Sequence, residues 1–165
     1  MANTIMLFGS SNITKMPENV LTTLQSYATA GWNFVVGDGI GADELFQHVL
    51  SSVGARDRTK IVTLGHAYRN KYGLENIELS TLYNENDKCA TIVDSNNNVL
   101  LTIDGVDKEM DLKTNDKYRQ SADRIMIDMS DFAICLWNGK SSTDFSIIQL
   151  AGIKNKMCYV VSLGE

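Results

Sequence analysis

Short runs of apolar residues, each ended by glycine or by small polar residues, recur along the chain. They span residues 4–8, 32–36, 60–64, 132–137 and 157–162. An apolar run of this length without alternation is typical of a strand that is buried on both faces. The pattern therefore predicts about five strands in the middle layer of a sheet.

Between these runs, apolar residues recur at helical spacing. The stripes predict helices over residues 17–30, 42–53, 119–129 and 145–153. Strands that alternate with helices form parallel sheets with right-handed crossovers. We therefore predict an α/β fold, with a Rossmann-like open parallel sheet of about five strands and helices on both faces.

The alternation breaks between residues 72 and 117, where Asn, Asp and Glu are frequent. Within this segment, the apolar runs Ala90–Val93 and Val99–Ile103 flank the polar stretch Asp94–Asn98. Two such runs around a polar turn indicate a β-hairpin. The chain contains neither a repeat nor a linker, so we expect one Rossmann-like domain over residues 1–165 with an inserted β-hairpin at about 72–117.

Composition narrows the classes of partner. The chain has 165 residues, 44% of them hydrophobic, and a net charge of −5. This charge argues against a broad basic surface, so no nucleic acid is expected as a partner. No apolar run approaches the roughly 18 residues that span a bilayer, so no membrane is expected either. The N-terminus lacks the pattern of a signal peptide, and we expect a cytoplasmic protein.

The three cysteines are far apart and form no C-x-x-C pair. This spacing predicts neither a zinc site nor a redox dithiol. Cys135 and Cys158 lie in apolar runs and are interpreted as small buried residues. We predict no metal and no cofactor.

Three loops rich in small residues follow predicted strands. They are Gly9–Ser11, Gly37–Asp43 and Asn138–Thr143. Ligands of open parallel sheets bind beyond the carboxyl ends of the strands. Glycine lets backbone amides approach a ligand, and the helix that follows favours an anion. The loops together predict a phosphate or nucleotide site.

Two familiar phosphate-binding motifs do not fit these loops. In the Gly37–Gly41 loop, the third glycine comes one residue too early for G-x-G-x-x-G. Lys140-Ser141 matches the end of a Walker A loop, but the glycine that should precede it is missing. Dinucleotide redox chemistry and P-loop hydrolysis are therefore not expected.

The same loops carry a resemblance to a known family. The chain resembles the SLOG superfamily of Rossmann-like nucleotide-binding proteins, in its YspA/YpsA-related branch. The matching segments are Ile5–Ser10, Val35–Asp43, Tyr118–Gln120 with Arg124 and Met126, Ser130-Asp131, Trp137–Ser141, Leu150-Ala151 and Tyr159–Val161. The resemblance covers roughly residues 4–68 and 117–163.

The chain also departs from the pattern of that family. Asn138 replaces an aspartate of the family's W-D-G-K-S-x-G-T motif, and the second glycine of this motif is missing. Related nucleotide N-glycosidases have a catalytic glutamate three residues after the corresponding Gly-Thr, where this chain has Ser146 or Ile147. Because cleavage of this kind needs a carboxylate near the sugar, no catalytic residue is predicted.

The loops and the resemblance together define a set of candidate ligand-binding residues. They are Gly9, Ser10, Ser11, Gly37, Asp38, Gly39, Gly41, Asp43, Arg119, Trp137, Asn138, Gly139, Lys140 and Ser141.

Several of these candidates also have a structural alternative. Asp38 suits a ribose hydroxyl, and Asp43 suits a ligand or a helix cap. Ser10 and Ser141 either donate to phosphate oxygens or cap helices, and the resemblance favours the ligand.

Each of the remaining candidates also has both a ligand-binding and a structural interpretation. Lys140 either pairs with a phosphate or stands free in solvent, and Arg119 binds an anion, contacts another subunit or decorates the surface. Trp137 either stacks on a base or packs in the core. His66 follows the third predicted strand, so it lies near the same edge, where a ligand or catalytic role is the lesser alternative.

The function implied by the resemblance is the binding of a nucleotide-derived small molecule, such as an ADP-ribose-like or cyclic nucleotide. The missing glutamate favours sensing or sequestration without turnover. One alternative is an N-glycosidase of a nucleoside 5′-phosphate in which Asp38 or Asp144 supplies the carboxylate. Another is a protein-interaction module that uses the 72–117 insertion. A homo-oligomer is expected, with the insertion as subunit contact or as lid.

Overall fold

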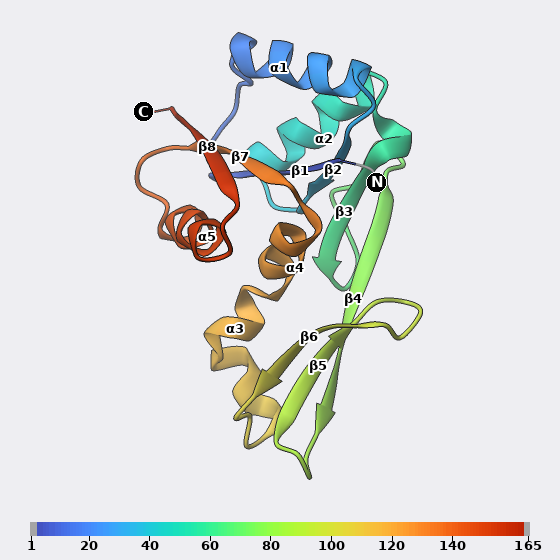
Figure 1. Cartoon of the computed structure of the whole chain (residues 1–165), viewed down its shortest axis with the longest axis vertical. Coiled ribbons are helices and arrows are strands. Elements are labelled where there is room, and N and C mark those ends of the chain that lie inside the picture. The colour runs from blue at the N-terminus through green and yellow to red at the C-terminus, as the bar shows by residue number, and fades with distance from the viewer. Residues whose placement is uncertain (1–2, 164–165) are drawn as a thin grey trace.

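The structure, a computed structural model, describes residues 3–163 and contains one eight-stranded sheet with helices on both faces (Figure 1). The strands are β1 Thr4–Gly9, β2 Asn33–Val36, β3 Thr59–Leu64, β4 Glu75–Asn84, β5 Cys89–Val93, β6 Val99–Asp104, β7 Phe132–Trp137 and β8 Met157–Ser162. The α-helices are α1 Glu18–Thr29, α2 Ala42–Ser52, α3 Asp116–Arg119, α4 Ser121–Met129 and α5 Ser142–Ile153, and the 3-10 helices are η1 Arg56–Arg58 and η2 Glu109–Thr114. The predicted α/β class is confirmed.

The strand order is β6-β5-β4-β3-β2-β1-β7-β8. The six strands from β4 to β8 in this order are mutually parallel, and β5 pairs antiparallel with both of its neighbours, β4 and β6. The sheet therefore has more than the predicted five or so strands. The additional parallel strand is β4, which the sequence analysis missed because exposed polar side chains interrupt its apolar ones.

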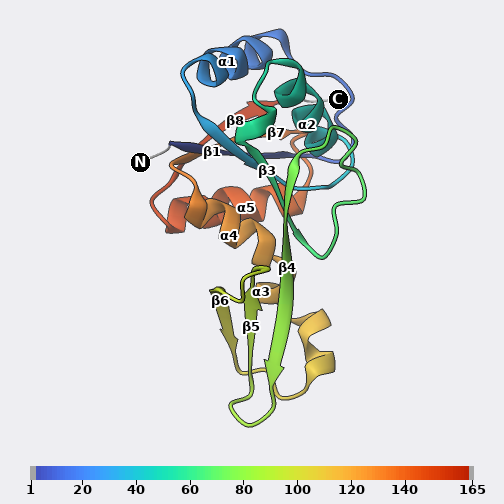
Figure 2. The same ribbon diagram turned by 90° about the vertical axis from the view of Figure 1, so that its right-hand side faces the viewer.

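The two faces of the sheet are covered by different helices (Figure 2). Alternation along β1 shows the division, because Ile5 and Leu7 pack in the core beneath α1 and α2. Met6 and Phe8 point the other way, into the core formed with α4 and α5. A strand that is buried on both faces reads as a continuous apolar run, and this explains why β1 was predicted from the sequence.

The segment 72–117 contains the predicted hairpin, formed by β5 and β6. Strand β4 joins this hairpin to the main sheet, because Glu75–Leu79 pairs with β3 and Ser80–Asn84 pairs with β5. Figures 1 and 2 show the resulting extension, flanked by α3. Its apolar side chains belong to the same core cluster as those of α4 and α5. The insertion thus continues the sheet.

Two further expectations concern single features of the chain. Among the helices within residues 3–163, none has the length and apolar character needed to cross a bilayer. Cys135 is buried as predicted, whereas Cys158 is only half-buried. Burial raises the pKa of the Cys158 thiol to about 11.

Candidate ligand site at the carboxyl edge of the sheet

The strand order reverses at β1. From β1 the chain proceeds through β2 and β3 toward β4 on one side, and it later returns to place β7 and β8 on the other side. In open parallel sheets, ligands bind at such a switch point, in the crevice outside the carboxyl ends of the strands. The loops after β1 and β7 flank this point, and the loop after β2 packs on the loop after β1, so the structure brings together all three predicted loops.

Ser10 lies at the centre of this edge and is buried. Its Oγ donates to Oδ2 of Asp144 at 2.6 Å and accepts from the backbone N–H of Asn138 at 3.0 Å. Gly9 beside it has no room for a side chain, since a Cβ would lie 2.4 Å from the carbonyl oxygen of Leu136 and 2.6 Å from Cβ of Ala42. The Gly-Ser pair thus joins β1 to β7 and α5.

Asp144 is the carboxylate of this network and is 3% exposed. Burial raises its pKa above the ordinary value, while hydrogen bonds from Ser10 and Ser141 act in the opposite direction. An unpartnered carboxylate at this depth would be costly, so the hydrogen bond from Ser10 stabilises Asp144 in its buried position.

The loop after β7 is closed by its own hydrogen bonds. Oδ1 of Asn138 accepts from the backbone N–H groups of Lys140 and Ser141, at 2.8 and 2.9 Å. Gly139 has a φ of 80°, which favours glycine. Oγ of Ser141 caps α5 by accepting from the N–H of Asp144 at 3.2 Å. The structural alternative for Ser141 is therefore realised in this structure.

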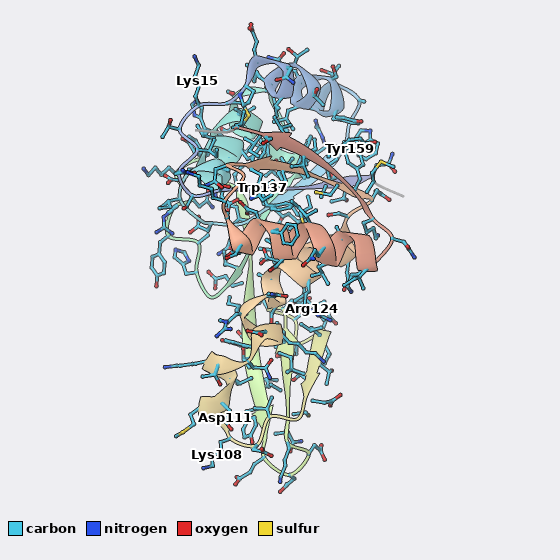
Figure 3. All side chains as sticks on the ribbon, turned by 90° about the vertical axis from the view of Figure 1, so that its left-hand side faces the viewer. Lys15, Lys108, Asp111, Arg124, Trp137 and Tyr159 are labelled. Carbon is cyan, nitrogen blue, oxygen red and sulfur yellow. The ribbon has the colours of Figure 1, made fainter. Side chains whose placement is uncertain are left out.

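Trp137 and Lys140 differ in their surroundings. The indole Nε1 of Trp137 donates to the carbonyl oxygen of Ser141 at 3.1 Å, and its ring stacks on Phe145 with centroids 6.1 Å apart. Figure 3 shows Trp137 beside α5. Lys140 is exposed at the tip of the loop. Of the two, Lys140 is the side chain that is free to meet a ligand.

A hollow of about 740 Å³ lies beside the switch point. Its volume is in the range of small-molecule sites, about 300–1,000 Å³. It is lined by Asn12, Ile13, Thr14, Lys15, Met16, Pro17, Glu18, Leu21, Asn138 and Leu163. Asn138 connects it to the network described above, because its Nδ2 donates to Oδ1 of Asn12 at 2.9 Å.

Most of this lining comes from the segment between β1 and α1, which the sequence analysis did not single out beyond Ser11. The available signal was the length of the connection, since eight residues separate Gly9 from Glu18. Short connections are more usual between a strand and its crossover helix. A long segment at a sheet edge is thus a reason to suspect a binding loop.

The loop after β2 packs against the loop after β1. A Cβ on Gly41, whose φ is 77°, would lie 2.2 Å from the carbonyl oxygen of Ser11. Oδ2 of Asp43 accepts from the N–H of Gly39 at 2.9 Å and lies 2.8 Å from where a Cβ on Gly37 would stand. Because Gly37, Gly39 and Gly41 have no side chain, Asp43 can approach the first two and the backbone of Ser11 can approach the third.

Asp38 is held by the protein itself. Its Oδ2 accepts from the backbone N–H of Arg69 at 3.0 Å, and its Oδ1 accepts from Nε2 of Gln47 at 3.3 Å. The carbonyl oxygen of Asp38 also accepts from Nη1 of Arg69, at 2.9 Å. The residue expected to contact a ribose therefore fastens the segment after β3 to the loop after β2.

Carboxyl groups with raised pKa values gather at the starts of α2, α4 and α5. Burial raises the pKa of Asp43 to about 7, with smaller contributions from the charges of Asp123, Asp144 and Asp38. Burial, and to a lesser degree Asp144, also raises the pKa of Asp123 to about 7. Groups that titrate near neutrality can exchange protons with a ligand. Asp123 was missed because an acidic residue in a first helical turn also suits the helix dipole.

Arg119 is separate from the other candidates. It lies in α3, where it forms an ion pair with Asp116, and its Nη1 donates to the carbonyl oxygen of Lys113 at 3.4 Å. Figures 1 and 2 place α3 along the β4–β6 extension, away from the loops after β1 and β7. Within residues 3–163, no group of three His, Cys, Asp or Glu side chains is arranged to hold a metal ion.

Comparisons with known proteins add one neighbour. No protein-family model and no curated protein matches the chain. Among solved structures, it is similar to DNA processing protein A from Helicobacter pylori, with a TM-score of 0.60, 15% identity and coverage of 98% of this chain. The match spans 66% of that protein's chain. At this identity the similarity concerns the fold, which agrees with the Rossmann-like class predicted from the sequence.

The neighbour also corrects one expectation. That structure describes a single-stranded DNA binding mode of DNA processing protein A. The expectation that nucleic acid is not a partner, which rested on the net charge of −5, is contradicted by this finding. Net charge describes the whole surface and does not report a local binding face.

Proposed function

We propose that the protein binds a nucleotide-derived ligand in the hollow beside the switch point and does not turn it over. The observation that carries this proposal is the position of the hollow, at the carboxyl edge of the sheet beside the ends of β1 and β7, where the strand order reverses. Sites at this place in open α/β sheets hold ligands in unrelated proteins. The resemblance to the SLOG superfamily supports the nucleotide class of the ligand, with ADP-ribose-like and cyclic nucleotides as the first to test.

The polar lining is suited to the parts of a nucleotide. The side-chain amide nitrogen of Asn12 can donate to a ribose hydroxyl group or a base edge, whereas the amide of Asn138 is bonded to Lys140, Ser141 and Asn12 and shapes the wall of the hollow. Lys15 lines the hollow and Lys140 stands exposed on the adjacent loop, so both ammonium groups are available to a phosphate. Apolar atoms of Ile13, Met16 and Leu21 complete the lining.

Binding without turnover is supported by the surroundings of α5. At the place of the family's catalytic glutamate, Ile147 is buried and Ser146 donates to the carbonyl oxygen of Ser142 at 3.0 Å. Asp144, one of the two carboxylates weighed for catalysis, is buried against Ser10. The other, Asp38, accepts hydrogen bonds from Arg69 and Gln47.

One observation favours an enzyme as the second candidate. Glu18 lines the hollow, so a carboxylate is present at the proposed ligand site. Hydrolysis of an N-glycosidic bond would need such a group near the sugar. If this candidate is correct, Glu18→Gln abolishes release of free base and leaves ligand affinity within about threefold.

The experiment is a calorimetric titration of the protein with AMP, ADP-ribose and cyclic nucleotides, followed by chromatography of the ligand. We expect Lys15→Ala to weaken binding by roughly ten- to hundredfold, because a charge-assisted hydrogen bond contributes about 1.5–3 kcal/mol. Lys108→Ala is the matched control, since Figure 3 places Lys15 and Lys108 at opposite ends of the molecule. Intact ligand after incubation supports binding without turnover, and free base contradicts it.

A further inference from the structure

The connection between the parallel strands β3 and β4 is a loop, whereas such connections usually contain a helix. It consists of residues 65–74, Gly-His-Ala-Tyr-Arg-Asn-Lys-Tyr-Gly-Leu, and contains no helix. We refer to it as the 65–74 loop. It has two basic residues, Arg69 and Lys71, and no acidic residue, although the chain as a whole has a net charge of −5. The charge of this loop is therefore opposite in sign to that of the whole protein.

The loop is anchored from within. Ala67 and Leu74 are buried in the core beneath α1 and α2. Asn70 closes the loop, because its Nδ2 donates to the carbonyl oxygen of Leu74 at 2.6 Å and its Oδ1 accepts from the N–H of Leu74 at 3.1 Å. Tyr72 packs on the ring of His48, with centroids 5.5 Å apart. The exposed side chains of the loop thus project from a fixed backbone.

Tyr68 is the most exposed of the large apolar or aromatic side chains that the structure describes, at 85%. Its ring meets that of His66 edge to face, with centroids 4.9 Å apart and an interplanar angle of 81°. His66 is in turn held by Glu78, whose Oε1 lies 2.9 Å from Nδ1. The contact with His66 orients the tyrosine ring while most of its surface stays open.

The loop belongs to the same edge as the switch point. The hydrogen bonds of Arg69 to Asp38 join it to the loop after β2, which in turn packs on the loop after β1. From β7 to β3 there are three strand spacings, or roughly 14 Å at about 4.8 Å each. A stacked strand of nucleic acid rises about 3.4 Å per nucleotide. The strand separation is about four times this rise, so a strand of several nucleotides suits the two places better than a single nucleotide does.

We propose that the 65–74 loop is a second contact for an unpaired polynucleotide, of which one nucleotide occupies the switch-point hollow. Tyr68 stacks on an unpaired base, and Arg69 and Lys71 neutralise neighbouring phosphates. Aromatic rings beside cations are the means by which proteins bind single strands without reading their sequence. The inference rests on the proposed nucleotide site and deepens it by naming the ligand as a strand of several nucleotides.

The test measures fluorescence anisotropy with a labelled oligothymidine of about twelve nucleotides, a length within known single-strand site sizes. We expect Tyr68→Ala to weaken binding by roughly ten- to hundredfold, and Tyr68→Phe, which keeps the ring, to weaken it by less than threefold. Lys71→Ala lowers the slope of affinity against salt by about 0.7, while Lys108→Ala does not change it. DNA and RNA arms of the same length identify the type of strand.

The outcomes separate this inference from the proposed function. If the oligonucleotide binds no more tightly than AMP, or if Tyr68→Ala binds it as well as the wild type, the inference is overturned and the nucleotide site stands. If AMP does not bind but the oligonucleotide binds in a Tyr68-dependent manner, the loop contact is supported and the mononucleotide site is overturned. A duplex that binds as tightly as the single strand also overturns the inference, because stacking needs an unpaired base.

Discussion

The loops after β1 and β7 and the 65–74 loop lie on one edge of the sheet but use their polar groups in opposite ways. In the former, Ser10, Asn138 and Ser141 are bonded mainly to one another and to Asp144. In the 65–74 loop, Asn70, Arg69 and His66 are also bonded within the protein, but Tyr68 and Lys71 are left exposed. The small residues after β1 and β7 thus fix the shape of the carboxyl edge. The side chains available to a ligand lie in the neighbouring segments, residues 12–18 and the 65–74 loop.

The largest effect should come from filling the space at Gly9. Gly9→Val places side-chain atoms within 2.4 Å of the carbonyl oxygen of Leu136, so the ends of β1 and β7 must separate. We expect a loss of about 3 kcal/mol in the free energy of unfolding, measured with urea. Gly152→Ala is the matched control, since a Cβ there meets nothing within 4 Å, and it should leave stability unchanged or slightly raised. If Gly9→Val and Gly152→Ala changed the free energy of unfolding equally, the close contact of Gly9 with β7 would not matter for stability.

A smaller loss is expected from Ser10→Ala. It removes the donor to Asp144 and the acceptor for the N–H of Asn138, which leaves two polar groups without this partner. The expected cost is about 1–3 kcal/mol in the same unfolding experiment. Ser11→Ala, at an exposed position, should change stability by less than about 0.5 kcal/mol. If Ser10→Ala unfolds at the wild-type urea concentration but loses ligand binding, Ser10 is a ligand contact and not a structural one.

The raised carboxyl pKa values predict a pH dependence of stability. An aspartate in an unfolded chain has a pKa of about 3.9, whereas burial raises that of Asp43 to about 7. The folded chain then binds protons more tightly than the unfolded chain, so stability falls as the pH rises from about 4 to about 7.

Substitution at Asp43 isolates this effect. Asp43→Asn keeps an acceptor for the N–H of Gly39 and removes the titration. The fall in unfolding free energy between pH 4 and pH 7 should be smaller in this variant than in the wild type, and Asp104→Asn on the exposed strand β6 should not alter it. An unchanged profile for Asp43→Asn would show that Asp43 titrates normally.

How far the sequence predicts this protein depends on the range of the interactions involved. Buried parallel strands such as β1 and β7 were predicted because nearly all of their residues face a core, whereas β4 was missed because exposed polar side chains interrupt its apolar ones where it leaves the main part of the sheet. The carboxyl-edge loops were located correctly by their small residues. Their internal bonding was not predictable, since Ser10 and Asp144 are 134 positions apart. For the 12–18 segment the only signal was the length of the connection between β1 and α1, and Asp123 carries no local pattern that distinguishes a site from a surface.

The most direct test of the central claim is a two-dimensional ¹H–¹⁵N spectrum of the labelled protein, titrated with ADP-ribose and, separately, with the oligothymidine. A nucleotide site in the hollow predicts that amide shifts concentrate in residues 12–18 and 138–141 with either ligand. The oligothymidine should in addition shift residues 65–74. Shifts confined to the β4–β6 extension, or no shifts with either ligand, would contradict the account.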